Sequence, residues 1–331
     1  MLTRDKITEA LNDVLVPGIA YSIVRMNLVQ DINITETSVK VVLASTALSE
    51  NARAWINEKI LELIKKLDKA VDTEVAFVEK RPLELNSVNN IIAVMSGKGG
   101  VGKSLVTGLT AIALCRQGYT VGILDADITG PSIPKMFGIT TNPQGNESGI
   151  LPVLSANGIE IISINLFLPS EDEAVIWRGP LIGKAITQFW EDVLWGKLDY
   201  LLVDLPPGTA DAPLTALQVL PVSGAIIVFT PQDLTTMIVK KAVKMAQQMN
   251  KPVLGVVENM SYLYVPEIQK KIEIFGRSRG DEMSMAAGAP LLAKIPIDPK
   301  LALLCDEGHI ERYNSEVLTS FSKALQNALR S

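Results

Sequence analysis

The stretch that decides the fold is MSGKGGVGKSL, residues 95–105. Residues 97–104 within it match the pattern G-x-x-x-x-G-K-[ST]. The apolar run IIAVM, residues 91–95, leads into the pattern, and the helical run LVTGLTAIALCRQ, residues 105–117, follows it. A strand, a glycine-rich loop and a helix in this order are the context of a phosphate-binding P-loop. The sequence therefore predicts a nucleotide site in this loop.

The composition of the loop explains how it would bind phosphate. Its glycines let backbone N–H groups turn toward phosphate oxygens, and the start of a helix adds favourable dipole charge. We expect Lys103 to contact the β- and γ-phosphates and the Ser104 hydroxyl to bind Mg²⁺. The predicted nucleotide-binding residues of the loop are Gly97, Lys98, Gly99, Gly100, Val101, Gly102, Lys103 and Ser104. Phosphate binding needs one lysine, so the second, Lys98, requires a separate explanation.

The segment ILDADITG, residues 123–130, places two carboxylates at the C-terminal end of the second predicted strand of this region. Ligands of open α/β sheets bind at this end of the strands. We expect Asp127 to orient or activate the attacking water and Asp125 to reach the Mg²⁺ shell. The alternative for both is a solvated loop carboxylate.

A third carboxylate follows an apolar strand in YLLVDLPPGT, residues 200–209. Four largely apolar residues lead into Asp204, as in a Walker B strand, whose carboxylate holds Mg²⁺ directly or through water. The alternative for Asp204 is a cap at the end of the strand. Gly208 comes next, as expected of a loop that senses the γ-phosphate through its backbone.

The choice of base depends on a missing motif. GTP-specific P-loop proteins usually carry Asn-Lys-x-Asp, whereas the pair at residues 250–251 is followed by Pro252 and Val253. ATP is therefore the predicted nucleotide. Candidate contacts to adenine are Asn259, Pro296 and Asp298.

The order of the predicted elements defines the fold class. From residue 91 short apolar strands alternate with helical stretches, which predicts an α/β fold: a mostly parallel, doubly wound P-loop sheet. Its strands are expected near residues 91–96, 120–127, 199–206, 225–231, 253–259 and 291–297. A last helix, residues 313–330, is expected to pack on the core through Val317, Phe321, Leu325 and Leu329. This ATPase domain is assigned to residues 91–331.

A smaller α+β domain is predicted in front, over residues 1–82, with a linker over residues 83–90. Thr3 can cap a first helix with Ile7, Leu11 and Leu15 on one face. The other expected elements are strands at residues 28–35, 38–45 and 72–79, and a helix at residues 49–67 with Ile56, Ile60, Ile64 and Leu67 on one stripe.

Composition excludes several classes of protein. The 331 residues carry a net charge of −5, which argues against nucleic-acid binding. Apolar runs such as residues 225–229 are far shorter than the roughly 20 residues of a membrane helix, so no membrane partner is expected. The start MLTRDKITEA has no apolar signal-peptide core, and Cys115 and Cys305 imply no disulfide framework. A cytoplasmic location fits these observations.

Six motifs in fixed order carry a resemblance to a known family: SGKGGVGKS, DADITGPSIPKMFG, WRGP, DLPPGT, TPQDLT and VVENMSY. Over about residues 88–330 the chain resembles the Mrp/NBP35/ApbC family of iron–sulfur cluster carrier ATPases, which are similar to MinD and ParA. The segment YSIVRMNLVQDINITETSVKVVLAST resembles the MIP18-like (DUF59) domain found at the N-terminus of many members. The resemblance implies slow ATP hydrolysis coupled to cluster handoff.

The same resemblance supplies a role for Lys98. The segment KGGVGKS, residues 98–104, has an extra lysine five residues before Lys103 and resembles the deviant Walker A motif of MinD and ParA. In proteins with this motif the first lysine crosses a dimer interface to the partner's bound nucleotide, which implies a homodimer here. Phosphoryl transfer depends largely on positioned charge, so a cation supplied by a second subunit makes turnover conditional on dimerisation. The alternative for Lys98 is a surface lysine.

The chain departs from the family pattern where cluster ligands are expected. Carriers have Cys-x-x-Cys shortly after the Asn-Met-Ser segment, and two subunits then hold one bridging [4Fe–4S] cluster. Here Val265 and Ile268 occupy those positions, so we predict no iron–sulfur ligands in this chain. Cys115 is expected to be a core residue, whereas Cys305 could be a core residue or a free thiol.

Three functions remain open at this point. The first is a dimeric ATPase with the family's role in iron–sulfur assembly, acting on an iron–sulfur client. The second is an ATP-switched scaffold that has lost the cluster and serves a partner protein, such as a cysteine-bearing paralogue. The third is a positioning ATPase of the ParA or MinD type, which the acidic composition disfavours.

Overall fold

The computed structural model describes residues 2–19, 21–127, 130, 132–167, 179–209, 211–232 and 235–330. The chain divides into two compact units. The first comprises Met1–Val88, Asn142–Leu154 and Gln188–Leu198, and the second comprises Asn89–Thr141, Ser155–Thr187 and Asp199–Ser331. The first unit thus takes in two segments from far along the sequence, while the predicted boundary of the N-terminal domain at residue 82 stays a prediction.

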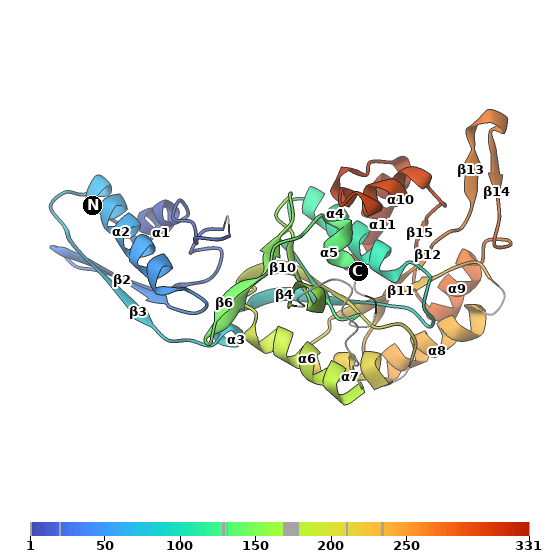
Figure 1. The fold of residues 1–331 in the computed structure, drawn as a ribbon, viewed down its shortest axis with the longest axis horizontal. Helices are drawn as coiled ribbons and strands as arrows, with labels where there is room; N and C mark the ends of the chain where they lie inside the picture. The colour runs from blue at the N-terminus through green and yellow to red at the C-terminus, as the bar shows by residue number, and fades with distance from the viewer. Residues whose placement is uncertain are drawn as a thin grey trace. The chain divides into compact units, whose positions relative to one another are not determined.

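The first unit is built on a small mixed sheet with strand order β1-β2-β3, against which helices pack (Figure 1). Strands β1 and β2 pair antiparallel, and β2 and β3 pair parallel. Its elements are α1 (Arg4–Leu11), β1 (Val29–Ile34), β2 (Ser38–Ala44), α2 (Glu50–Leu67), β3 (Asp72–Val78), α3 (Pro82–Leu85), β6 (Gln144–Asn146), β7 (Gly149–Leu151) and β8 (Val153–Leu154). The predicted α+β pattern is therefore present.

Two details of the predicted helices are wrong. Thr3 does cap α1, but the helix ends at Leu11, and Leu15 is 44% exposed. Val14 and Val16 are buried instead, because the chain beyond α1 is extended and alternate residues face the core. In α2 the side chains of Ile56, Ile60 and Ile64 are buried, whereas Leu67 at the end of the helix is exposed.

Residues distant in sequence complete the core of the first unit. Leu151 and Leu194 are buried in one hydrophobic cluster with residues of α1, α2 and the small sheet. The Ala47 N–H donates to Ser148 Oγ at 2.9 Å, and Asn146 Nδ2 donates to the Leu48 carbonyl oxygen at 3.1 Å. The core of this unit is therefore not formed by its N-terminal segment alone.

The second unit contains the parallel sheet that the sequence predicts. Its strand order is β15-β12-β11-β4-β10-β5-β9, and the pairs β15–β12, β12–β11, β11–β4, β10–β5 and β5–β9 are parallel. The strands are β4 (Ser87–Met95), β5 (Val121–Asp125), β9 (Glu160–Ser163), β10 (Lys197–Asp204), β11 (Gly224–Phe229), β12 (Val253–Glu258) and β15 (Leu291–Lys294). The short strand β9 was not predicted from the sequence, and α3 and the first residues of β4 occupy most of the predicted linker.

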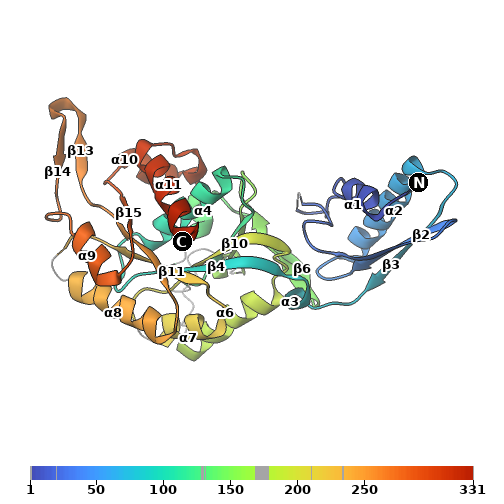
Figure 2. The same ribbon diagram turned by 180° about the vertical axis from the view of Figure 1, so that it is seen from behind.

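Helices cover both faces of this sheet (Figures 1 and 2). One face carries α4 (Lys103–Arg116), α5 (Ile133–Met136), α10 (Pro299–Asp306) and α11 (Glu316–Arg330). The other carries α6 (Gly179–Asp192), α7 (Asp211–Val219), α8 (Thr235–Gln248) and α9 (Gly280–Ala287). The predicted doubly wound α/β class is confirmed.

Two further details differ from the sequence-based expectations. Helix α11 begins at Glu316, because the Ser315 hydroxyl accepts from the Leu318 N–H at 3.1 Å and so caps the helix. Its buried face is formed by Leu318, Phe321, Leu325 and Ala328, rather than by Val317 and Leu329.

Between β12 and α9 the chain forms the hairpin of β13 (Leu263–Val265) and β14 (Lys270–Ile272), which extends away from the sheet in both views (Figures 1 and 2).

Candidate nucleotide-binding site

The glycine-rich loop joins β4 to α4, as its sequence predicts. Gly102 is the N-cap of α4 and has a φ of 80°, and Gly100 has a φ of 76°. Residues with a Cβ atom rarely adopt this left-handed conformation. Gly97 and Gly99 lie in the same loop, and Val101 between the two left-handed glycines is buried. The loop therefore has the backbone form that its glycines were expected to allow.

Asn259 holds the loop from the neighbouring part of the sheet. It follows β12 directly, is 1% exposed, and its Nδ2 donates to the Val101 carbonyl oxygen at 2.9 Å. A Cβ atom on Gly102 would lie 2.1 Å from the same Nδ2. The side chain that we expected to contact adenine thus supports the P-loop backbone in this structure.

Lys103 lies at the centre of the charged part of the site. Its ammonium is 2.9 Å from Asp204 Oδ2 and 3.2 Å from Asp127 Oδ2, and the residue is 5% exposed. Burial lowers the pKa of Lys103, but the negative charges of Asp204 and Asp127 outweigh it, so its pKa lies above the ordinary value. Lys103 therefore stays charged, as a phosphate-binding lysine must be.

The Asp204 carboxylate accepts hydrogen bonds from two hydroxyl groups in the first turns of α4. Ser104 Oγ donates to Asp204 Oδ2 at 2.5 Å, and Thr107 Oγ1 donates to Asp204 Oδ1 at 2.7 Å. The sequence analysis did not identify Thr107. Its position four residues after Lys103 was an available signal, because residues i and i+4 share one face of a helix.

The register of the strands places Ser163 of β9 in line with Asp125 of β5 and Asp204 of β10. Across the sheet Asp204 pairs with Asp125, and Asp125 pairs with Ser163. Ser163 Oγ donates to Asp125 Oδ2 at 2.9 Å, and the Asp127 N–H donates to Asp125 Oδ1 at 3.2 Å. Complete burial, with the charge of Asp204 nearby, raises the pKa of Asp125 to about 8. Sequence reasoning missed Ser163 because β9 itself was not recognised.

The donor atoms of this cluster fit Mg²⁺. Hard cations prefer oxygen ligands, and Mg²⁺ typically uses one or two carboxylates together with substrate phosphates and water. The Ser104 hydroxyl and the Asp204 carboxylate lie together, with Asp125 beside Asp204 in the sheet. In this structure the positive charge among these carboxylates is the Lys103 ammonium. A nucleotide-bound Mg²⁺ would supply further positive charge at the same carboxylates.

The ammonium of Lys98 has a different partner from that of Lys103. Its Nζ donates to Gln232 Oε1, a residue that the sequence analysis did not identify. The backbone around it is fixed, because Ser96 Oγ donates to the Lys98 carbonyl oxygen at 2.9 Å and the Gly208 N–H donates to the Ser96 carbonyl oxygen at 3.0 Å. Gly208, with a φ of 95°, thus donates its N–H to the residue that follows β4, and its expected role at the γ-phosphate stays a prediction.

Asp298, one of the expected adenine contacts, accepts hydrogen bonds from other residues of the chain. Asp298 caps α10, since its Oδ1 accepts from the Lys300 N–H at 2.9 Å. Its Oδ2 accepts from the Tyr313 hydroxyl at 2.9 Å. Pro296 is partly buried in the turn between β15 and α10. No contact joins either residue to the P-loop in the described part of the chain, so their role at the base stays a prediction.

The residues that replace the family cysteines lie in the β13–β14 hairpin. Val265 ends β13 and is partly buried, while Ile268 in the connecting turn is 54% exposed. Cys115 is in the last turn of α4 and partly exposed, so its assignment to the core is wrong; its Sγ contacts the Asn157 carbonyl oxygen at 3.6 Å. Cys305 on α10 is also partly exposed.

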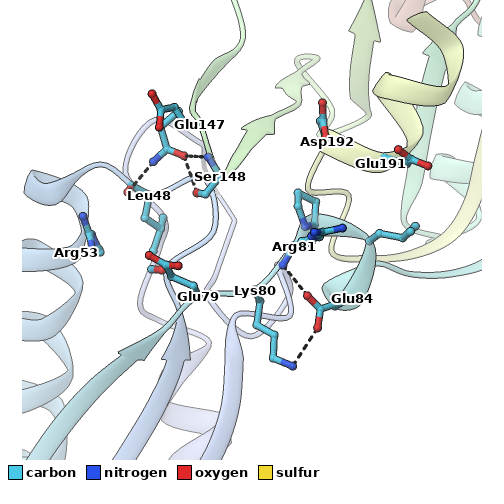
Figure 3. Close-up of a pocket in the computed structure, with 14 residues that line it drawn as sticks. Leu48, Arg53, Glu79, Lys80, Arg81, Glu84, Glu147, Ser148, Glu191 and Asp192 are labelled. Atoms are coloured by element: carbon cyan, nitrogen blue, oxygen red, sulfur yellow. Dashed lines mark hydrogen bonds and ion pairs between the residues drawn. The ribbon is translucent and has the colours of Figure 1, made fainter. Parts of the chain in front are cut away.

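A large polar cavity of about 970 Å³ belongs to the first unit and contains no P-loop residue (Figure 3). Arg53 of α2, the Lys80–Glu84 segment, and Glu147 and Ser148 of the β6–β7 turn line it. Lys80 Nζ donates to Glu84 Oε1 at 3.3 Å, and Glu84 Oε2 accepts from the Arg81 N–H at 2.9 Å. This cavity has no glycine-rich loop and is therefore a poor candidate for the nucleotide.

The motif residues 128, 129, 131, 177, 178, 233 and 234 lie outside the described residues. In the described ranges, no set of three or more His, Cys, Asp or Glu side chains is arranged to hold a metal ion by itself. No helix among the described residues combines the length and apolar character needed to span a membrane.

The parallel sheet, the left-handed glycines and the Lys103–Asp204 cluster define a P-loop NTPase. The nucleotide-binding protein of Archaeoglobus fulgidus, solved in complex with ADP, is 44% identical to this chain, covers 69% of it and 90% of its own length, and has a TM-score of 0.62. MinD of Pyrococcus horikoshii, solved with Mg-ADP, covers 73% of this chain and 96% of its own length at 22% identity and a TM-score of 0.51, a likeness of fold alone.

The chain belongs to the family of NUBPL iron-transfer P-loop NTPases, whose sequence model matches residues 87–329. A second model, described as iron–sulfur cluster assembly protein, matches residues 4–77. The iron–sulfur cluster carrier protein of Clostridium perfringens is 45% identical over 238 residues, which are 70% of this chain and 84% of that protein. The carrier protein of Synechocystis sp. is 37% identical over an alignment 347 residues long, which covers 98% of this chain and 97% of that protein. The family resemblance drawn from the motifs is confirmed.

Proposed function

We propose that this chain is a slow, magnesium-dependent, homodimeric ATPase that serves iron–sulfur cluster assembly through a partner supplying the thiolate ligands. One observation carries the proposal: the P-loop, Lys103 and Asp204 are assembled, while Val265 and Ile268 occupy the hairpin that follows Asn259. The cluster is thus the cargo of the reaction, and ATP is the nucleotide that drives it.

Lys103, Ser104 and Asp204 would hold the phosphates and the Mg²⁺ that neutralises them. Asp127, which forms an ion pair with Lys103 at 3.2 Å, would orient the attacking water once phosphate displaces that contact. Lys103→Ala should abolish ATP binding, because the phosphate charge loses its main partner. Isothermal titration calorimetry with ATP and GTP tests the base preference: equal affinities would refute ATP specificity.

Lys98 would act on the nucleotide of the partner subunit. Lys98→Ala should largely retain ATP binding but lose most turnover, and Asp127→Ala should lose turnover in its own site. Mixing these two inactive proteins should restore one active site in each mixed dimer. A mixture that forms heterodimers, verified by native mass spectrometry, yet stays inactive would refute the action in trans.

The absence of cysteine at positions 265 and 268 determines the cluster experiment. The aliphatic side chains of Val265 and Ile268 have no lone pair for iron, so anaerobic reconstitution of this chain alone should leave substoichiometric iron and no stable visible absorbance. Val265→Cys with Ile268→Cys should restore cluster binding across the dimer. Ile272→Cys with Ile274→Cys, both exposed positions of the same region, is the matched control.

Two results would favour the other functions. About two irons per subunit in the unaltered protein after gel filtration would point to unrecognised ligands, Cys305 first. ATP-dependent pelleting with liposomes or DNA would favour a positioning ATPase. Anaerobic pull-down with mass spectrometry tests for the cysteine-bearing partner that the proposal requires.

A further inference from the structure

Lys98 is held by its own chain in this structure. Its ammonium donates to the side-chain oxygen of Gln232, which lies three residues after the end of β11. Strand β11 is the sheet neighbour of β4, the strand that leads into the P-loop. The contact therefore joins the C-terminal ends of two adjacent strands, and both side chains are partly buried.

Hydrogen bonds fix the backbone around Lys98, so its side chain is the part that can move. The Ser96 hydroxyl holds the Lys98 carbonyl oxygen at 2.9 Å, and the Gly208 N–H holds the Ser96 carbonyl oxygen at 3.0 Å. The Lys98 side chain, with four rotatable bonds, can change its partner without moving these atoms. An ammonium that donates to Gln232 in this way is directed to its own chain, so this contact competes with an action on the nucleotide of another subunit.

The chemistry of the acceptor decides how firmly Lys98 is held. An amide oxygen offers a dipole, whereas a polyphosphate offers several negative charges, which form shorter and stronger hydrogen bonds with an ammonium. Among the described residues no carboxylate forms an ion pair with Lys98, in contrast to Lys103. Gln232 can therefore hold Lys98 when no phosphate faces it and release it when one does.

We propose that Gln232 is a positioning residue that holds Lys98 in cis in the single subunit and releases it to the nucleotide of a second copy. This inference rests on the proposed action of Lys98 in trans. It adds a regulatory step to the same site: the cis hydrogen bond competes with the dimer-specific contact. Turnover is thereby kept low until the concentration of ATP-bound subunits is high enough for dimers to form.

The test is the dependence of ATP turnover on protein concentration. In Gln232→Ala the competing contact is gone, so half-maximal turnover per subunit should occur at about fivefold lower protein concentration, in line with the net strength of one such hydrogen bond. Gln232→Glu replaces the amide by a carboxylate, which should hold Lys98 as an ion pair and shift the midpoint to higher concentration. Thermal melting of both variants should match the unaltered chain.

Two controls isolate the contact. Lys98→Ala combined with Gln232→Ala should behave as Lys98→Ala alone, because Gln232 acts only through Lys98. Gln117→Ala removes a glutamine whose Nε2 donates to Ser322 Oγ at 2.7 Å on the α11 side of the sheet, and it should leave the midpoint unchanged. Equal midpoints for the unaltered chain, Gln232→Ala and Gln232→Glu, or a shift of the same sign in both variants, would overturn the inference.

The same measurements separate this inference from the proposed function. If Lys98→Ala keeps full turnover, the action in trans is wrong. If Lys98→Ala loses turnover, the mixed dimer with Asp127→Ala regains it, and the Gln232 variants still show no shift, the action in trans stands and only the role of Gln232 is refuted.

Discussion

Replacing Gly102 by alanine should destabilise the nucleotide-free protein more than the same change at Gly100. Both residues have a left-handed backbone, with φ of 80° and 76°. An L-residue in this conformation costs roughly 1–2 kcal/mol, and this cost applies to both variants. The two sites differ in their surroundings: a Cβ atom on Gly102 would lie 2.1 Å from Asn259 Nδ2, whereas one on Gly100 would meet nothing within 4 Å.

The difference between the two variants can be worked out from that contact. The alanine methyl at position 102 forces the Asn259 amide away from the Val101 carbonyl oxygen, to which it donates at 2.9 Å. Leaving a buried polar group unpaired costs about 1–3 kcal/mol. We therefore expect a loss of roughly 2–5 kcal/mol for Gly102→Ala and roughly 1–2 kcal/mol for Gly100→Ala.

Urea unfolding followed by circular dichroism measures both free energies. A third protein, Gly102→Ala with Asn259→Ala, completes a double-mutant cycle. Without the Asn259 amide, the methyl at position 102 has no partner to displace, so its cost should fall to that of Gly100→Ala. If the two single variants lose stability equally, or if the cycle shows no coupling, the account of Asn259 as the support of the P-loop is wrong.

Three further predictions concern a buried acid, a thiol and a long-range core contact. Asp125 has a folded pKa of about 8 against an ordinary 3.8. The stability that its bound proton contributes is therefore complete below about pH 4 and is lost as the pH rises through 8. Asp125→Asn should for this reason melt higher than the unaltered, Mg²⁺-free chain at pH 8.5, with a smaller advantage at pH 5. Burial, with the charge of Asp306, raises the pKa of Cys305 to about 11. In a Cys115→Ser background, iodoacetamide should therefore alkylate Cys305 slowly at pH 8 and faster up to pH 11. Full reaction within minutes at pH 7 would contradict this. Leu194→Ala removes a fully buried side chain of the first unit and should cost about 2–5 kcal/mol in urea unfolding, whereas the exposed Leu83→Ala should stay within about 0.5 kcal/mol of the unaltered chain.

The sequence by itself determined the elements whose signals are local. The P-loop pattern, the apolar strands and the aspartates at their ends are each contained in a short window, and the structure has the predicted strand, loop and helix around Lys103. The helical spacing of Ile56, Ile60 and Ile64 likewise identified a buried face. Such patterns are readable because the period of a helix or strand repeats within a few residues.

Only the tertiary structure decided which distant residues meet. Ser163 faces Asp125 because β9 pairs in register with β5, and Gln232 reaches Lys98 because β11 lies beside β4. In the first unit, Leu151 and Leu194 fill a core begun more than a hundred residues earlier. Strand order and register arise from packing of the whole chain, and no single window of the sequence contains them. For this reason Ser163 and Gln232 were missed, whereas the candidate residues Lys103, Asp125 and Asp204 could be named from their local motifs.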